Sequence, residues 1–251
     1  MAAPGWLTAR PIAHRGYHDE AAGRLENTLP AAEAAMRRGF SIECDIQLTA
    51  DGRIVVFHDD TLERLTNLVG DVSARTFAEL RAAHFLAGAA TIPTLEELLD
   101  LVDGKVPLVV EFKSRFTGDR RLEKAAANVL LGYEGPLAVM SFDPASMIAL
   151  RRLAPGIPRG LLADRFDTAG WPEIPSHVRR LAYRWMLAAP LIWPSFVAYD
   201  VNALPASPPL ALRHFFRLPL LTWTVRTPEQ RAIAKEWADQ VIFEGFDPEA
   251  G

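Results

Sequence analysis

The sequence predicts an α/β fold, a (β/α)₈ TIM barrel with a small hairpin-plus-loop excursion inserted after the second strand. Eight short apolar runs are typical of buried strands, and helical patterns separate most of them, as in a parallel sheet. The length of 251 residues, 49% of them hydrophobic, suits one such barrel. We therefore expect a single domain over residues 1–251, with the excursion at about residues 47–93. An open doubly wound sheet is the alternative, although no G-x-G-x-x-G follows the first strand.

The strands and helices can be placed from local patterns. The apolar runs predicted as strands are 10–14, 41–46, 107–113, 136–142, 159–164, 196–201, 220–225 and 240–245. The segments predicted as helices are 28–39, 94–104, 120–132, 143–156 and 227–238. Thr94 is expected to cap its helix, with Glu97 as the capping-box partner three residues later.

A hairpin interrupts this alternation after the second strand. Residues 47–58 have no room for a crossover helix, so two antiparallel strands must meet in a tight turn. With Asp51-Gly52 as a two-residue loop, Asp45 pairs with His58, and Glu43 lies on the same face. The three side chains then converge at the carboxyl end of a barrel strand, where barrel enzymes place their chemistry. The alternative is a structural ion pair between Asp45 and His58.

Other polar side chains follow neighbouring strands. His14 and Arg15 end the first strand, ahead of a glycine that permits close backbone approach. Glu111 and Lys113 share one side of the run 107–113, where a buried carboxylate needs a partner or a metal. The alternatives are a Glu111–Lys113 pair without a metal and, for the "ENT" at 26–28, a role of Thr28 as a helix cap alone.

These candidates together favour phosphate chemistry. Glu43, Asp45 and Glu111 form a set of three carboxylates, which suits a hard divalent cation such as Mg²⁺ or Ca²⁺. Arg15 and Lys113 suit an anion, and His14 with His58 offers an acid/base pair. An anion that requires a metal, two cations and proton transfer is typical of a phosphate ester.

Composition excludes several other classes. The net charge of −4 and the absence of a basic block argue against a nucleic-acid partner. Cys44 is the single cysteine, so no disulfide can form within the chain. The first sixteen residues lack the pattern of a signal peptide, and no run reads as a membrane span. We expect a soluble cytoplasmic protein without stable membrane insertion; its oligomeric state stays open.

Taken together, the motifs are familiar. The sequence resembles the glycerophosphodiester phosphodiesterase family through "AHRG" (13–16), "ENT" (26–28), "ECDIQLTADGRIVVFHDDTLERLT" (43–66), "IPTLEELL" (92–99), "VEFK" (110–113), "SFDP" (141–144), "RGLL" (159–162) and "WTV" (223–225). The pieces stand in family order over nearly the whole chain, and the block 43–66 is specific.

The resemblance implies a metal-dependent barrel that cleaves glycerophosphodiesters to sn-glycerol 3-phosphate and an alcohol. The resemblance implies one divalent cation, Mg²⁺ or Ca²⁺, as the cofactor. The roles it implies are metal ligation by Glu43, Asp45 and Glu111, acid/base catalysis by His14 and His58, and substrate binding by Arg15, Lys113 and Trp223.

The sequence departs from the family pattern in the last strand. Glu244 and Gly245 stand where the family usually has Thr-Asp ahead of a proline, which bears on substrate preference. Segment 165–194 also aligns poorly, and its aromatic residues are either core or an unusual pocket rim. The alternatives are a related lysophospholipase D or phospholipase C-like barrel, with residues 84–90 as an apolar rim, and a barrel that binds phosphodiesters without turnover.

Overall fold

The computed structural model describes residues 3–167, 171–172, 174 and 176–249. Its strands form one sheet in the order β1-β9-β8-β7-β6-β5-β4-β2-β3, and an additional pairing of β1 with β2 closes a ring of eight strands. The pairings resolved along the ring are parallel, whereas β3 lies outside it and is antiparallel to β2. This topology confirms the predicted (β/α)₈ barrel and its excursion.

All eight predicted barrel strands are present, most of them shortened by one or two residues. The strands are β1 (Ile12–Ala13), β2 (Ser41–Leu48), β3 (Ile54–Val56), β4 (Leu108–Phe112), β5 (Leu137–Ser141), β6 (Arg159–Ala163), β7 (Phe196–Asp200), β8 (Leu220–Val225) and β9 (Gln240–Phe243).

The five predicted helices are also present, and the structure adds others. The α-helices are α1 (Leu29–Arg38), α2 (Phe77–Arg81), α3 (Leu95–Val102), α4 (Arg121–Leu131), α5 (Pro144–Leu153), α6 (His177–Arg184), α7 (Ala189–Ile192), α8 (Ser207–Phe216) and α9 (Pro228–Trp237). Short 3₁₀ turns are η1 (Gly5–Thr8), η2 (Glu20–Ala22), η3 (Val72–Ala74) and η4 (Val201–Ala203). The capping box of Thr94 and Glu97 forms as predicted.

The chain divides by its internal contacts into two compact units. The N-terminal unit comprises residues 13–113 and 120–137, and the C-terminal unit comprises residues 1–12, 114–119 and 138–251. Every predicted site residue except Trp223 belongs to the N-terminal unit. The single domain over 1–251 stays a prediction.

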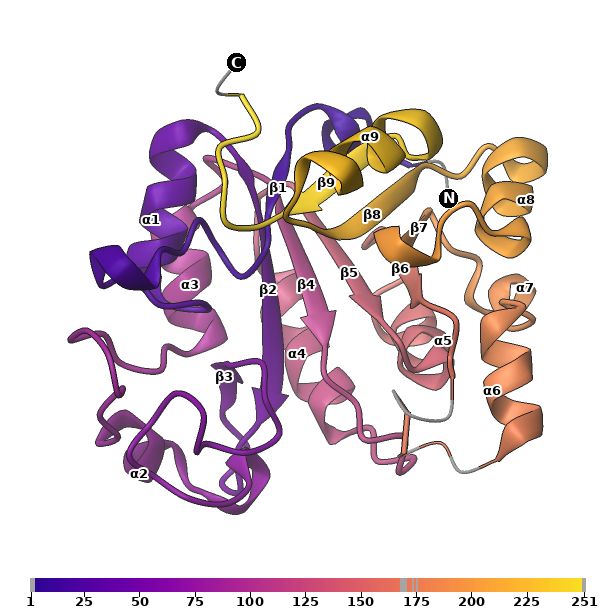
Figure 1. Ribbon diagram of the computed structural model, residues 1–251. Coiled ribbons are helices and arrows are strands. Elements are labelled where there is room, and N and C mark those ends of the chain that lie inside the picture. The colour runs from indigo at the N-terminus through magenta and orange to yellow at the C-terminus, as the bar shows by residue number, and fades with distance from the viewer. Residues whose placement is uncertain (1–2, 168–170, 173, 175, 250–251) are drawn as a thin grey trace. The chain divides into compact units, whose positions relative to one another are not determined.

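In the N-terminal unit, α1 and α3 pack against each other (Figure 1). The excursion beyond β3 carries α2 and encloses a small apolar core that includes Val55, Phe57, Leu62 and Leu80. Phe85 belongs to this core, whereas its neighbour Leu86 is 66% exposed. Within residues 84–90, Phe85 is buried and Ala87 and Ala90 pack partly against the core, while the other four residues are exposed. The excursion is a folded element with its own core.

The hairpin differs from the sequence prediction by one residue. Ile46 pairs with Val56, not with Phe57, and Thr49 pairs with Arg53 through backbone hydrogen bonding. The loop therefore has three residues, and its last residue, Gly52, adopts φ +82°. A left-handed glycine at the end of a three-residue loop is a common hairpin geometry. The predicted pairing of Asp45 with His58 is wrong, because β3 ends at Val56 and Phe57 N donates to Asp45 O instead.

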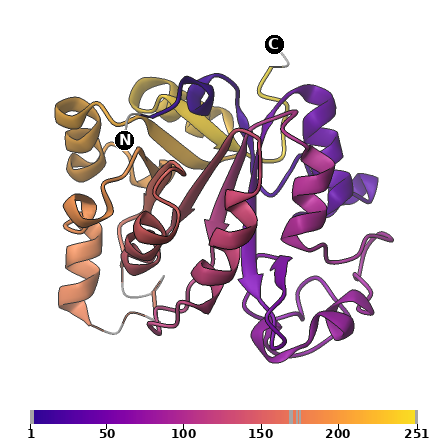
Figure 2. The same cartoon turned by 180° about the vertical axis from the view of Figure 1, so that it is seen from behind.

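In the C-terminal unit, β6 to β9 pair in sequence and α6, α7 and α8 follow one another along one side (Figures 1 and 2). Phe166, in the poorly aligned segment, is buried and belongs to the core. Trp171 is half-buried and packs against it at a ring distance of 4.8 Å. Trp185 and Trp193 are instead exposed. Among the described residues, no helix is long and apolar enough to cross a membrane.

Candidate active site

Three buried carboxylates gather on two adjacent strands of the N-terminal unit. β2 and β4 run parallel with Asp45 directly opposite Glu111, and Glu43 precedes Asp45 on the same face of β2. One carboxylate oxygen from each residue lies within 4.8 Å of the others. The structure thus brings together the three carboxylates named from the sequence, through the register of β2 and β4.

Hydrogen bonds hold one oxygen of each β2 carboxylate and leave the other available. The Arg15 backbone N–H donates to Glu43 Oε2 at 2.9 Å, and Asn27 Nδ2 donates to Asp45 Oδ2 at 2.9 Å. Within the part of the chain that the structure describes, Glu43 Oε1 and Asp45 Oδ1 are buried without a hydrogen-bond partner. Oriented carboxylates with spare buried oxygens fit a divalent cation, and Mg²⁺ and Ca²⁺ both prefer oxygen ligands.

The pKa values of the three carboxylates also favour a bound divalent cation. Burial raises the pKa of Glu43 well above its usual range, and the negative charges of Asp45 and Glu111 raise it further. Burial also raises the pKa of Glu111, against the opposing charge of Lys113. For Asp45 burial acts in the same direction, yet Lys113, His58 and Arg15 bring its pKa below the ordinary value. Like charges crowded in a buried site favour a bound cation.

Two cations lie beside the carboxylates. Lys113 Nζ lies 3.0 Å from Glu111 Oε1 and 3.6 Å from Asp45 Oδ1. Arg15 Nε lies 3.4 Å from Asp45 Oδ2. The Glu111–Lys113 pair considered from the sequence thus forms. Three carboxylates against two cations still leave one negative charge, so a divalent cation would make the cluster able to attract a phosphodiester monoanion.

The two histidines stand in different surroundings. His14 Nε2 lies 3.9 Å from Glu43 Oε2, at the carboxylate cluster. His58 follows β3, and its Nδ1 lies 2.7 Å from Asp59 Oδ1. The charge of His58 lowers the pKa of Asp45 and of Glu111, so the ring lies within electrostatic reach of the cluster. Gly16 permits a close backbone approach, as expected, and the neighbour is α1: at φ +78°, a Cβ there would lie 2.9 Å from Ala31.

Several residues that shape this site were missed by sequence reasoning. Gln47 Nε2 lies within hydrogen-bond distance of three successive carbonyls: 3.0 Å from Phe57 O, 3.3 Å from His58 O and 2.6 Å from Asp59 O. It holds the backbone that carries His58. The adjacent acid in "HDD" could have pointed to Asp59, but a glutamine side chain that binds backbone leaves no recognisable spacing in the sequence.

The "ENT" segment has a larger role than helix capping. Thr28 precedes α1 but makes no side-chain cap bond; its hydroxyl donates to Leu25 O. Asn27 binds Asp45, as described above. Glu26 accepts from Arg15 at 2.7 Å, and it also accepts from Arg64, which donates to Asp59 at 3.0 Å. A continuous chain of charged hydrogen bonds therefore links Arg15 to His58.

The remaining predicted residues belong to the C-terminal unit. Trp223, on β8, contacts Phe142 edge to face at a ring distance of 5.4 Å, and its role in substrate binding stays a prediction. Glu244 lies directly after β9, where the sequence departs from the family pattern, and accepts from Arg226 at 2.8 Å.

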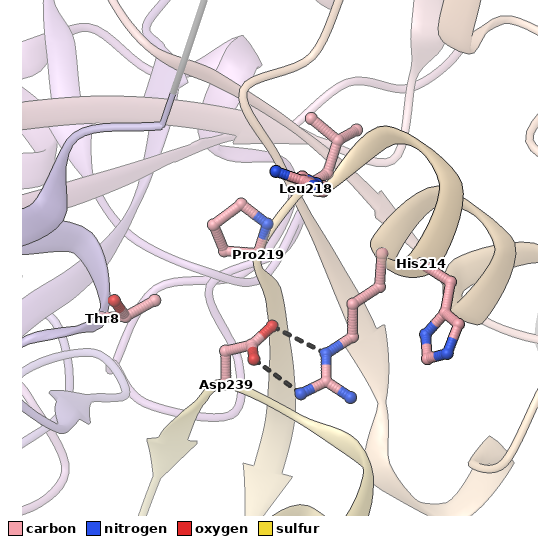
Figure 3. A pocket seen from close by; sticks show the side chains of 7 residues that line it. Thr8, His214, Leu218, Pro219 and Asp239 are labelled. Atoms are coloured by element: carbon pink, nitrogen blue, oxygen red, sulfur yellow. Dashed lines mark hydrogen bonds and ion pairs between the residues drawn. The ribbon is translucent and has the colours of Figure 1, made fainter.

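A groove of about 560 Å³ in the C-terminal unit holds none of the predicted site residues. Figure 3 shows Thr8, Pro219 and Asp239 at this groove, with an ion pair between Asp239 and a neighbouring arginine, Arg213. Pro219 and Asp239 immediately precede β8 and β9, so the groove lies at the amino ends of those strands. Barrel enzymes place their chemistry at the opposite, carboxyl ends.

Comparisons with known proteins agree with the sequence and the fold. The model of the glycerophosphoryl diester phosphodiesterase family matches residues 14–247. A glycerophosphodiester phosphodiesterase of Bacillus altitudinis is 35% identical over 162 residues, which span 60% of this chain and 65% of that protein.

Two solved structures share the fold. A phosphodiesterase of Oleispira antarctica, in complex with the product sn-glycerol-3-phosphate, superposes with a TM-score of 0.74 at 22% identity over 93% of this chain and 91% of that one. A putative glycerophosphoryl diester phosphodiesterase of Silicibacter pomeroyi superposes with a TM-score of 0.74 at 27% identity, over 93% of this chain and 89% of that one. Because the family model covers nearly the whole chain, the chain belongs to the glycerophosphoryl diester phosphodiesterase family.

Proposed function

We propose that the chain hydrolyses glycerophosphodiesters to sn-glycerol 3-phosphate and an alcohol with the help of one divalent cation. The observation that carries this proposal is the buried cluster of Glu43, Asp45 and Glu111, in which two carboxylate oxygens of the described residues accept no hydrogen bond. Membership of the family and the product named for the Oleispira antarctica relative support the same reaction.

The three carboxylates would hold the cation, either Mg²⁺ or Ca²⁺, since both bind oxygen ligands. When bound, the cation supplies a Lewis acid for a phosphoryl oxygen and a template for the glycerol hydroxyl. Arg15 and Lys113 would contact the phosphate and stabilise the charge that develops on its oxygens.

Proton transfer would be divided between the two histidines. His14 would remove a proton from the nucleophile, and His58 would donate a proton to the leaving alkoxide. The lowered pKa of Asp59 keeps its carboxylate ionised, so it accepts from Nδ1 of His58 and leaves Nε2 to face the substrate. The nucleophile is either water or the 2-hydroxyl of the substrate. A trapped cyclic phosphate would identify the hydroxyl, and rapid ¹⁸O uptake from water without it would identify water.

The test is release of glycerol 3-phosphate from glycerophosphocholine, glycerophosphoethanolamine and glycerophosphoglycerol, after chelation and after Mg²⁺ or Ca²⁺ is restored. We expect release only with the cation present. Lysophosphatidylcholine, assayed in parallel, tests the lysophospholipase alternative. Turnover of the lysolipid alone would replace the proposed substrate class, and absence of turnover on every substrate with metal bound would contradict the proposal.

A further inference from the structure

The C-terminal unit carries an apolar face that points away from its core. Val178, Leu181 and Trp185 follow one another at three- and four-residue spacing, so they form one stripe along α6. Their exposed fractions are 75%, 45% and 53%. A helical stripe of this kind normally faces the interior. Here the stripe is exposed, and Met186, which follows Trp185, is buried instead.

Exposed apolar side chains also occur in and beside α7. Leu187 precedes α7 and is 66% exposed, Leu191 in α7 is 62% exposed, and Trp193 at its end is 60% exposed. We call these three residues and the α6 stripe together the α6–α7 face. The helix α8 lies along the same side of the unit as α6 and α7 (Figures 1 and 2) and ends in Phe215 and Phe216, which are 81% and 69% exposed. Exposed apolar side chains gathered on neighbouring elements are typical of an interaction site.

Exposed arginines lie beside this face, although the net charge of the whole protein is −4. Arg179 belongs to α6 and is exposed. Arg184 is exposed beside Trp185. Arg151 of α5 donates to Leu191 O at 2.7 Å and lies 6.0 Å from the ring centre of Trp193. Arginines therefore border the apolar side chains.

We infer that the α6–α7 face docks on an anionic lipid surface. Exposed tryptophan and leucine side chains enter the boundary between head groups and acyl chains, and neighbouring arginines bind lipid phosphates. A second copy of the chain is a poorer occupant, because a symmetric contact would bring the same arginines against each other. This docking differs from the proposed catalytic function and does not depend on it.

The test is cosedimentation of the full chain with vesicles of phosphatidylcholine mixed with phosphatidylglycerol, and with vesicles of phosphatidylcholine alone. We expect binding to the anionic vesicles that weakens as salt is added, because the attraction between arginines and lipid phosphates is screened. Binding should fall at least about tenfold in the double variant Trp185→Ser, Leu187→Ser. It should fall roughly fivefold in Arg184→Glu.

The matched control is Leu86→Ser, since Leu86 has the same exposed fraction as Leu187, 66%, but lies in the excursion. It should leave vesicle binding unchanged, and thermal unfolding should show that all variants are folded. Absence of vesicle binding, binding that is insensitive to salt, or equal loss in the control variant would overturn the inference. So would a dimer, detected by sedimentation velocity, that dissociates in the double variant, because the face would then bind a second copy.

Discussion

Asp59 and Gln47 determine how His58 is presented. Asp59 accepts from one ring nitrogen, and Gln47 binds the backbone on both sides of the ring. A histidine that is 30% exposed would otherwise sample several rotamers. Proton transfer requires a fixed ring and one available nitrogen, so these two contacts are expected to matter for rate more than for folding.

His58→Ala should lower kcat by roughly 10²–10⁴-fold, as expected for loss of a general acid. The side chain is partly exposed, so the free energy of unfolding should change little. Steady-state kinetics on glycerophosphocholine with the cation present would measure the effect. His84→Ala, at an exposed histidine of the same unit, is the control and should remain as active as the wild type. Equal activity in both variants would remove His58 from the mechanism.

Gln47→Met should reduce kcat by up to about a hundredfold, because a methionine of similar length cannot hold the backbone from Phe57 to Asp59. The unsatisfied carbonyls should also cost about 1–3 kcal/mol of unfolding free energy. Cation affinity should stay near that of the wild type, since the three carboxylates remain. A positioning role for Gln47 predicts a lowered kcat together with unchanged cation affinity. A variant with unchanged kcat but lowered stability would limit Gln47 to a structural role.

The acid dependence of stability should include a contribution from Asp59. Burial alone would raise the pKa of Asp59, but hydrogen bonds from His58 and Arg64 bring it below the ordinary value. A lowered pKa contributes stability above about pH 4, and the contribution is lost as pH falls through the folded-state value. Asp59→Asn should therefore be about 1 kcal/mol less stable than the wild type at pH 7, with a smaller difference near pH 2. Urea unfolding that gave the same difference at both pH values would contradict this assignment.

At the scale of elements, the loop length of the hairpin could not be predicted from the turn residues alone. Asp51 and Gly52 indicated the turn, but whether a loop has two or three residues depends on contacts outside it. Here the Arg53 N–H donates to Thr49 Oγ1, and Phe77 N donates to Asp51 Oδ1 from the excursion. These bonds stabilise the longer loop, so the register could not be derived from the turn residues alone.

Gly52→Ala tests the three-residue loop. Gly52 has φ +82°, and a Cβ there would meet nothing within 4 Å, so the cost is backbone strain without a clash. We expect a loss of about 1 kcal/mol in the free energy of unfolding. The control is Gly156→Ala, where a Cβ is equally unhindered and φ is not left-handed. Denaturant unfolding that gave equal stability for both variants would be inconsistent with a strained loop at Gly52.

At the scale of the molecule, the barrel and the position of its carboxylates could be predicted because both follow from strand order. Parallel strands end on the same side, so Glu43, Asp45 and Glu111 had to lie near one another once β2 and β4 were neighbours. The hydrogen-bond network from Glu26 through Arg64 to Asp59 could not be predicted, because it joins loops whose paths depend on the core of the excursion. The helices α6 to α8 were not among the predicted helices, although the spacing of Val178, Leu181 and Trp185 is helical.

The metal site at Glu43, Asp45 and Glu111 is tested most directly by calorimetric titration of the metal-stripped chain with Mg²⁺ and with Ca²⁺. We predict one bound cation per chain and at least about tenfold weaker binding in Glu111→Gln, which removes one ligand charge. Glu123→Gln is the control, since Glu123 is a buried glutamate on α4 outside the cluster. Unchanged affinity in Glu111→Gln, or absence of cation binding by the wild type, would contradict a metal site at these carboxylates.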